Sequence, residues 1–375
     1  TSLYEDDIPS MVKATDPILG LINLARMRKI PLRDQYNSIG IDVEWNTVTY
    51  VDKCLRMYKE NMELFDFTDM LESFPKEGQS NCPSFDLCFV DEAQDLSPIQ
   101  WDIAHIIDEK SDRMYCAGDD DQAIYRWAGA DVEHFINLEG GSETLYQSYR
   151  VPFEIHKLAE RVVYRIKKRF LKEYKPKADV RGSIRRIFGV EEIDMSEGSW
   201  LILAQAGYQL NPVAGELRSS GYLFNNRGHR SISENISDAV NGWEQLRKGK
   251  EVNGAVARKI YSFMSTKDRV ARGFKKLTSV EDTDLLDLKA LTADHGLLAT
   301  EDMVWHIAMD RMPESERAYI IAMLRRGERF NGEPRITVST IHGAKGGEAD
   351  NVVLFTDLSP ASEEQMTINP DDMHR

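Results

Sequence analysis

Two adjacent carboxylates, Asp91 and Glu92, come directly after an apolar run at residues 87–90. A hard cation such as Mg²⁺ takes oxygen ligands, and a second acid beside it can activate a water molecule. Taken alone, an acidic pair after a strand is as often the N-terminal end of a helix, where carboxylates suit the dipole. A second acidic turn, at residues 118–122, follows the next apolar run. Together the two segments predict a magnesium–nucleotide site, with Asp91 as the metal ligand and Glu92 as the general base.

Gln122 ends that acidic turn, and Tyr125, Arg126 and Trp127 follow it closely. A neutral amide can donate to a terminal phosphate and respond to its loss, although an ordinary turn residue also explains Gln122. The aromatic residues could equally pack against the protein. An aromatic–cation–aromatic triplet beside a phosphate-sensing loop nevertheless favours base stacking, which contributes ~1–3 kcal/mol per base.

Two further segments carry residues suited to phosphate or nucleic acid. Arg150 ends the first α/β region, where it could contact a phosphate with two hydrogen bonds, although a surface salt bridge is the simpler explanation. Residues 340–348 combine glycines with His342 and Lys345, which could contact phosphate or DNA. A lone histidine is more often structural than catalytic, so the glycines are the stronger indication of a ligand.

Strands and helices alternate around the acid pair, which is typical of a parallel α/β sheet. We expect a helix that begins near Ser97 and Pro98, a favourable capping pair, and strands at residues 85–90, 114–117 and 144–147. Ligands of such sheets bind at the carboxyl ends of the strands. Both acidic segments lie at such ends.

The remaining sequence predicts two helical regions and a second α/β unit. Residues 1–74 and 231–330 have helical periodicity, and a long amphipathic helix is expected at 152–170. The second unit has a helix expected at 212–218 and strands expected at 183–190, 200–204, 222–224, 336–340 and 351–355. The predicted fold class is therefore α/β, with two parallel-sheet domains and helical insertions.

The composition is that of a soluble globular chain, with 375 residues, 42% hydrophobic and 29% charged residues, and a net charge of −15. That charge argues against wrapping nucleic acid by bulk attraction. Residues 161–172 and 267–276 are locally basic, and solvated helix faces are their simpler interpretation. Four cysteines without zinc-site spacing, and no apolar run of the ~18 residues that a membrane span needs, predict a cytoplasmic protein.

Five segments, in order along the chain, resemble the motifs of superfamily-one DNA helicases of the UvrD/Rep/PcrA type. They are residues 65–71, 90–95, 117–130, 149–150 and 338–348. The resemblance implies two RecA-like motor domains, both incomplete here, with ATP at their interface. The implied organisation is a helical insertion subdomain of the first motor domain at 1–76, the C-terminal part of that domain at 77–150, the first part of the second motor domain at 151–230, its helical insertion at 231–332 and its later part at 333–375.

The same resemblance implies an ATP-dependent helicase or translocase that uses Mg²⁺. Its implied partners are single-stranded DNA and junctions of single- and double-stranded DNA. The implied direction is 3′ to 5′, in repair, replication or recombination at the nucleoid. Carried over residue by residue, it implies catalytic roles for Asp91, Glu92, Gln122 and Arg150, nucleotide binding by Tyr149, Gly346 and Glu348, and DNA binding by Phe67, Tyr125, Arg126, Trp127, Thr340, His342 and Lys345.

Two motifs of the family have no counterpart in the chain. One is the GxxxxGK[ST] phosphate loop, and the other is the final segment with its arginine finger. Both belong beyond the two ends, and the chain begins with Thr1, so we expect a fragment that is inactive alone. Ala128 stands where relatives commonly have Arg, which puts one DNA or phosphate contact in doubt. Gly347 and Ala349 replace bulkier apolar residues, which predicts a looser loop there.

An alternative hypothesis is a non-catalytic single-stranded DNA-binding or scaffold module derived from a helicase. Tyr125 and Trp127 could give such a module its affinity. The intact Asp91, Glu92 and Gln122 count against it, because a site without catalysis has no evident need for all three.

Overall fold

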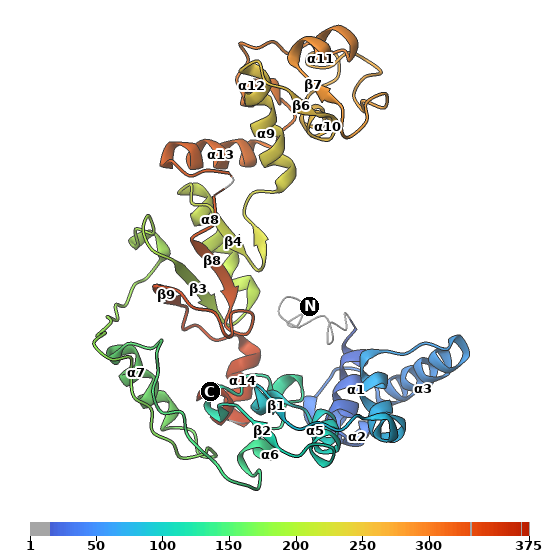
Figure 1. Cartoon of the computed structure of the whole chain (residues 1–375), viewed down its shortest axis with the longest axis vertical. Coiled ribbons are helices and arrows are strands. Elements are labelled where there is room, and N and C mark those ends of the chain that lie inside the picture. Colours follow the sequence, from blue (N-terminus) through green and yellow to red (C-terminus); the bar gives the residue numbers. More distant parts are fainter. Residues whose placement is uncertain (1–15, 331, 369, 375) are drawn as a thin grey trace. The chain divides into compact units, whose positions relative to one another are not determined.

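The computed structural model describes residues 16–330, 332–368 and 370–374 (Figure 1). The chain divides into two compact units. The first unit holds residues up to 186 together with those from 357 onward, and the second holds residues 187–356. Among the described residues, no helix has both the length and the apolar character needed to cross a membrane.

Four helices open the first unit: α1 (Pro17–Met27), α2 (Leu32–Ile39), α3 (Trp45–Met62) and α4 (Phe67–Ser73). Asp16 caps α1 by accepting a hydrogen bond from the Ile18 amide at 2.8 Å. Pro17 occupies the first turn, where a backbone N–H would have no partner within the helix, so the missing N–H of proline costs nothing. Ile18, Leu21, Ile22 and Val48 form a small core between α1 and α3. The helical prediction for this region is confirmed over its described residues, and residues 1–15 lie outside them.

The first unit continues with two short parallel strands, β1 (Cys88–Val90) and β2 (Met114–Cys116), joined by α5 (Pro98–Glu109). Ser97 and Gln100 form a capping box at the start of α5, as the Ser-Pro pair predicts. Trp101 and Ala104 bury the inner face of α5. Helix α6 (Val132–Ile136) follows, after the 3-10 turns Ala93–Asp95, Asp120–Gln122 and Arg126–Ala128.

Several expected elements differ in the structure. Residues 144–147 form no strand, and only Gln147 makes an isolated bridge, to Lys175. The helix expected at 152–170 is α7 (Phe153–Val163), which stops early because later backbone amides donate to carboxylates: Lys167 and Lys168 to Asp371, and Phe170 to Asp120.

The strand expected at residues 183–190 is also wrong. Only a 3-10 turn, Val190–Glu192, forms there. Ile184 and Phe188 are exposed, and only the end of the run, at Ile187 and Val190, packs against the core of the second unit. The part of the chain that the structure describes also contains the π-helical turn Phe74–Gly78 and the 3-10 turns Gln79–Asn81 and Gly207–Leu210.

A five-stranded sheet organises the second unit, in the order β5-β4-β8-β3-β9. Its strands are β3 (Trp200–Ala204), β4 (Phe224–Asn226), β5 (His229–Arg230), β8 (Ile336–Thr340) and β9 (Asn351–Leu354). β4, β8, β3 and β9 run parallel, and β5 is antiparallel to β4. Because β8 comes after the helical insertion yet lies between β4 and β3, the interrupted α/β topology is confirmed. The strand expected at 222–224 begins later, at Phe224.

Helix α8 (Asn211–Ser219) connects β3 to β4. Five more described helices form the insertion: α9 (Glu234–Arg247), α10 (Gly254–Ser262), α11 (Leu288–Asp294), α12 (Trp305–Ala308) and α13 (Glu314–Arg326). The insertion also contains a strand pair that periodicity did not predict, β6 (Val252–Asn253) with β7 (Leu285–Leu286). Trp243 is fully buried and donates to the Met303 carbonyl at 2.8 Å. The chain ends with α14 (Pro360–Ile368) and α15 (Pro370–His374), in the first unit.

Candidate active site

Asp91 and Glu92 leave the carboxyl end of β1 in a tight turn. Asp91 is exposed, and its Oδ1 accepts a hydrogen bond from the Glu92 amide at 2.9 Å. Glu92 has φ 52° and ψ 38°, in the left-handed region that residues other than glycine rarely adopt. Such backbone strain costs of order 1–3 kcal/mol and gathers at functional sites. The strained residue is the one that the sequence predicts as the general base.

Gln94 connects this turn to the end of β2. Its side chain is fully buried, its Nε2 donates to Glu92 Oε2 at 2.6 Å, and its Oε1 accepts from the Asp119 amide at 2.9 Å. Gly118 allows the approach, because a Cβ there would lie 2.4 Å from Gln94 Oε1. One amide side chain therefore fixes the two acidic segments against each other.

Asp119 carries the connection on to Gln122. The exposed Gln122 donates from Nε2 to Asp119 Oδ2 at 2.5 Å, and Asp119 Oδ1 accepts from the Asp121 amide at 3.2 Å. Glu92, Gln94, Asp119 and Gln122 thus form a continuous hydrogen-bonded line. We did not predict Gln94 and Asp119 as site residues, although an amide two positions after the base was a usable signal.

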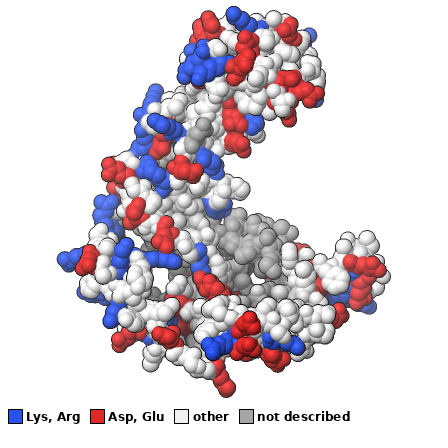
Figure 2. All heavy atoms as spheres, viewed as in Figure 1, with Lys and Arg blue, Asp and Glu red and all other residues white. Residues whose placement is uncertain are grey.

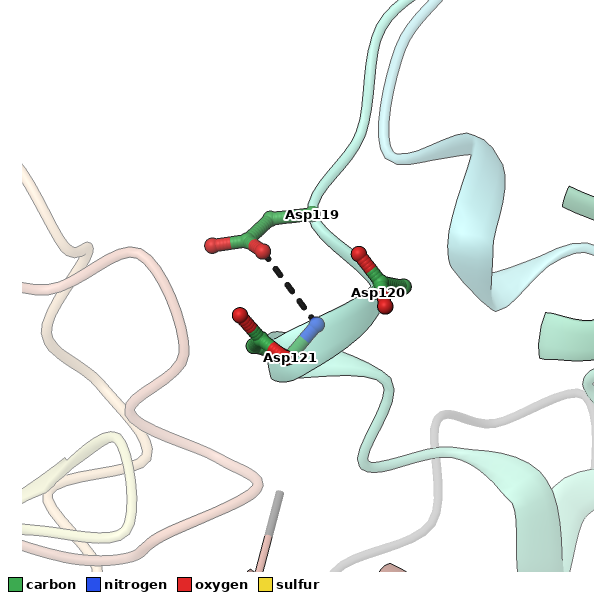
Figure 3. A group of neighbouring side chains, drawn as sticks. All are labelled: Asp119, Asp120 and Asp121. Carbon is green, nitrogen blue, oxygen red and sulfur yellow. Dashed lines mark hydrogen bonds between the residues drawn. The ribbon is translucent and has the colours of Figure 1, made fainter. Parts of the chain in front are cut away.

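Asp119, Asp120 and Asp121 are the one group of three metal-type side chains found among the described residues, with oxygens within 4.8 Å of one another (Figure 3). Two cations of the protein already pair with them. Arg169 donates to Asp121 Oδ1 at 2.8 Å and Oδ2 at 2.6 Å, and Lys172 Nζ lies 3.0 Å from both Asp119 Oδ1 and Asp121 Oδ2 and contacts Asp120. Asp91 differs from this group, because it is an exposed carboxylate at the end of β1, and exposed carboxylates are the type of ligand that Mg²⁺ takes in proteins.

The two basic residues correct one expectation. A solvated helix face was the simpler interpretation of residues 161–172, yet the side chains of Arg169 and Lys172 are each only 6% exposed. Burial by itself lowers the pKa of Lys172, but the charges of Asp119, Asp120 and Asp121 outweigh it and raise that pKa. Elsewhere the lysines and arginines visible in Figure 2 are interspersed with acidic residues rather than gathered into one track.

The other basic run, residues 267–276, also has a structural member. The Lys275 ammonium contacts the carbonyl oxygens of Tyr261, Ser262 and Met264 at the end of α10, where a cation suits the helix dipole. Burial lowers the pKa of Lys275, and the nearby Arg311 charge acts in the same direction.

The aromatic residues after Gln122 lie on a supported turn. The ring centroids of Tyr125 and Trp127 are 6.4 Å apart at 49°, and both side chains are half-buried rather than fully exposed. Arg28, the residue that follows α1, donates to the Arg126 carbonyl at 2.9 Å. Gly129, with φ 104°, allows α1 to approach the turn closely.

Three more predicted residues of this unit lie at its surface. Tyr149 is 80% exposed, and Arg150 beside it is exposed, with its backbone amide donating to Ser148 Oγ at 3.3 Å. Phe67 is exposed at the start of α4. The acids on either side of Phe67 have a structural role, because Asp66 and Asp69 pair with cations of α1 and α3.

The predicted residues of the second unit lie on the loop after β8. Thr340 is fully buried, and its Oγ1 accepts from the Gly343 amide at 3.1 Å, which closes the turn. His342 and Lys345 are half-buried, and Glu348 is exposed. Gly346 has φ 82°, a conformation that favours glycine. This loop follows the carboxyl end of a parallel strand, as the acid pair does in the first unit.

Comparison with known proteins supports the family resemblance. The family model described as UvrD/REP helicase N-terminal domain matches residues 12–141. The helicase homologue YjcD of Bacillus subtilis (strain 168) is 27% identical over 185 residues, which cover 46% of this chain and 24% of that protein. The ATP-dependent DNA helicase PcrA of Leuconostoc citreum is 27% identical over 158 residues, which cover 39% of this chain and 21% of that protein.

PcrA of Staphylococcus epidermidis is 28% identical over 113 residues, or 27% of this chain and 16% of that protein. The matched part of the chain thus spans a quarter or less of the length of these relatives. The family model covers β1, β2 and the whole hydrogen-bonded line from Glu92 to Gln122. Residues 12–141 are therefore similar to the N-terminal domain of UvrD/REP helicases, and the chain resembles helicases of the UvrD/PcrA type over these partial alignments.

Proposed function

We propose that this chain supplies the water-activating and phosphate-sensing residues of an ATP-dependent DNA helicase or translocase. The observation that carries the proposal is the hydrogen-bonded line from Glu92 through Gln94 and Asp119 to Gln122. Hydrogen bonds between the intervening residues fix the position of the base, Glu92, relative to the sensor, Gln122. Phosphoryl transfer requires such fixed positions, because its catalysis depends mainly on how the reacting groups are placed.

Each residue has a distinct proposed task. A bound Mg²⁺ would supply positive charge that neutralises the negative charge developing on the transferred phosphate. Asp91 would hold that ion, Glu92 would accept the proton of the attacking water, and Gln122 would donate to the terminal phosphate. Because Gln122 Nε2 here donates to Asp119 Oδ2, contact with a phosphate requires the amide to exchange one acceptor for another.

The remaining assignments follow the family resemblance. Tyr149 would pack on the adenine, Arg150 would contact the γ-phosphate, and Gly346 and Glu348 would bind the nucleotide. The proposed DNA contacts are Phe67, Tyr125, Arg126, Trp127, Thr340, His342 and Lys345. The half-buried Tyr125–Trp127 pair supports a stacking role, because its rings are fixed before any base arrives. We also propose two RecA-like domains with the boundaries expected above, and movement in the 3′ to 5′ direction.

The 375 residues contain no GxxxxGK[ST] segment, so they lack the loop and lysine that cradle phosphates in this class of enzyme. We therefore propose that these residues alone turn over ATP negligibly. DNA-stimulated ATP hydrolysis by the purified 375-residue chain, lost in Glu92→Gln, would disprove this part of the proposal.

The main test uses the complete protein in which this sequence occurs. Glu92→Gln keeps the size and hydrogen bonding of the side chain but removes its basicity, so DNA-stimulated ATP hydrolysis should fall by at least ~10²-fold. Glu139→Gln, the same change on an exposed loop, is the matched control and should leave the rate unchanged. If Glu92→Gln retains full hydrolysis, the proposed catalytic role is wrong.

Direction and the alternative are tested with the same protein. Partial duplexes with either a 3′ or a 5′ single-stranded tail should be unwound only from the 3′ tail. A protein that binds single-stranded DNA but shows no Glu92-dependent hydrolysis would instead be the non-catalytic binding module.

A further inference from the structure

The turn that carries Gln122 is fixed by a segment that the phosphate-sensing role does not include. Residues 167–174 follow α7 and lie against residues 119–121, with Arg169 bidentate on Asp121 and Lys172 in contact with all three carboxylates. Of these carboxylates Asp120 and Asp121 are buried. The contact is therefore a buried ion-pair network rather than a surface one.

The segment is itself fixed in place by backbone hydrogen bonds. The Phe170 amide donates to Asp120 Oδ2 at 2.8 Å. The Lys167 and Lys168 amides each donate to the Asp371 carboxylate at 3.0 Å. Tyr174 lies beside the network, where burial and the Asp119 charge raise the pKa of its hydroxyl. The backbone that carries Arg169 and Lys172 is thus fixed by hydrogen bonds.

Asp119 is the point where this network meets the sensor. Its Oδ2 accepts from Gln122 Nε2 at 2.5 Å, and its Oδ1 lies 3.0 Å from Lys172 Nζ. If the Gln122 amide leaves Asp119 for a phosphate, Lys172 keeps the carboxylate paired. Moving the Gln122 amide from Asp119 to the phosphate then breaks one hydrogen bond from a neutral donor. The half-buried Asp119 carboxylate keeps its ion pair with Lys172 throughout.

We propose that Lys172 and Arg169 are positioning residues that hold the Asp119–Asp121 turn and so set where Gln122 rests and how readily it turns to the phosphate. The inference rests on the proposed function, because it takes Gln122 to be the phosphate sensor. Without the two cations, three carboxylates with oxygens within 4.8 Å of one another would repel and open the turn. Gln122 would then lose its defined starting position.

The first test needs no nucleotide and uses the 375-residue chain. Backbone hydrogen exchange is followed by mass spectrometry in Lys172→Met, which keeps the length of the side chain and removes its charge. Exchange of the peptide that contains residues 118–123 should quicken by at least ~10-fold, as expected for the loss of the bonds that hold the turn. Peptides from β3 and β8 in the second unit serve as an internal reference and should not change.

Lys168→Met is the matched control. Lys168 stands on the same segment and pairs with Glu133 at 2.9 Å, but its side chain is 67% exposed. Exchange at residues 118–123 should stay as in the unchanged chain. Lys172→Arg keeps the charge and should restore at least half of the lost protection. If Lys172→Met leaves the 118–123 peptide protected, or if Lys168→Met exposes it equally, the proposed positioning is wrong.

The second test measures ATP hydrolysis by the complete protein. A displaced sensor weakens transition-state contacts more than nucleotide binding, so Lys172→Met should lower kcat by about 10-fold with KM for ATP within about twofold. If Lys172 had only a structural role, Lys172→Met would reduce the fraction of folded, active protein and leave kcat per active molecule unchanged. The recovery of kcat in Lys172→Arg would then not follow the recovery of exchange protection. Unchanged kcat despite faster exchange would overturn the positioning of Gln122.

The two tests separate failure of this inference from failure of the proposed function. Glu92→Gln is measured beside Lys172→Met in the same protein. If Glu92→Gln has no effect on hydrolysis, the proposed function fails, and the exchange experiment still decides whether the two cations hold the turn.

Discussion

Two acid clusters in the first unit have the same number of carboxylates and cations but different surroundings. The outer acid cluster is Asp66, Asp69 and Glu72 with Arg26 and Lys59. The inner acid cluster is Asp119, Asp120 and Asp121 with Arg169 and Lys172. Each contains three carboxylates and two cations. Their burial and their neighbours therefore decide what each cluster does, since the charges do not.

Side chains of the outer acid cluster are 14–34% exposed, and its acids also cap α4. That cluster fastens α4 to α1 and α3, and water screens it. Four of the five side chains of the inner acid cluster are at most 6% exposed, and its turn ends in Gln122. The inner acid cluster can transmit a change of position to a neighbouring residue, because several hydrogen bonds and ion pairs hold each of its groups. Separating its buried charges would cost much free energy.

The largest expected difference is in stability. Removing one partner from a buried network leaves uncompensated charge, so Lys172→Met should lower the unfolding free energy of the first unit by about 3–5 kcal/mol. Lys59→Met, the same change in the outer acid cluster, should cost only about 1 kcal/mol because water can solvate the remaining acids. Urea unfolding followed by hydrogen exchange of first-unit peptides measures both. Equal losses in the two variants would remove the distinction between the clusters.

A second expected effect concerns the glycine that admits Gln94 to the inner acid cluster. A Cβ at Gly118 would lie 2.4 Å from Gln94 Oε1 and 2.8 Å from Phe135 Cζ. Gly118→Ala should therefore destabilise the first unit by about 1–3 kcal/mol, because the Gln94–Asp119 bond must break or its neighbours must shift. Gly141→Ala, with nothing within 4 Å of the added carbon, is the control and should stay within about 0.5 kcal/mol. Chemical denaturation compares the two variants.

Sequence patterns predicted the parts of this site that depend on local order. The strand ends at Asp91 and Gly118, the cap of α5, and the return of β8 to an interrupted sheet all follow from hydrophobic runs and turn residues. Those features need no knowledge of distant partners. The motif resemblance was equally local, and the family model covers residues 12–141.

The partners of both acid clusters could not be predicted in the same way. Arg169 pairs with Asp121 across 48 positions, and periodicity made Arg169 look like part of a solvated helix. The early end of α7 has the same cause, because carboxylates compete for backbone amides that a helix would use itself. Residues 144–147 and 183–190 failed as strands because a strand requires a neighbour, and apolar composition does not supply one.

The pH dependence of the outer acid cluster is a third way to test the comparison. Partial burial alone would raise the pKa of Asp69, but hydrogen bonds from Lys59 and the Asp66 backbone and the charge of Arg26 lower it from 3.8 to about 2. As the pH falls, the unfolded chain therefore binds the Asp69 proton before the folded chain does. The stabilisation is full above about pH 4 and is lost down to about pH 2.

Asp69→Asn cannot titrate, so its first unit should lose less stability between pH 4 and pH 2 than the unchanged chain loses. The two proteins should also differ most at pH 4 and above. Thermal melts at both pH values, with exposed Asp179→Asn as the control, measure the difference. The same loss in Asp69→Asn and in the unchanged chain would show that this carboxylate is not coupled to folding.

Salt gives the smallest expected effect and the most direct comparison of the two clusters. The Debye length falls from about 10 Å at 0.1 M to about 3 Å at 1 M salt, which weakens exposed pairs and affects buried pairs much less. Double-mutant cycles on Lys59–Asp66 and on Lys172–Asp121 isolate one pair from each cluster, at 2.9 and 3.0 Å. The coupling energy of the first pair should fall by roughly half between the two salt concentrations, and that of the second should change by less than about a fifth. If both couplings fall alike, water reaches the inner acid cluster, and Lys172 is then no better placed to hold Asp119 than a surface lysine would be.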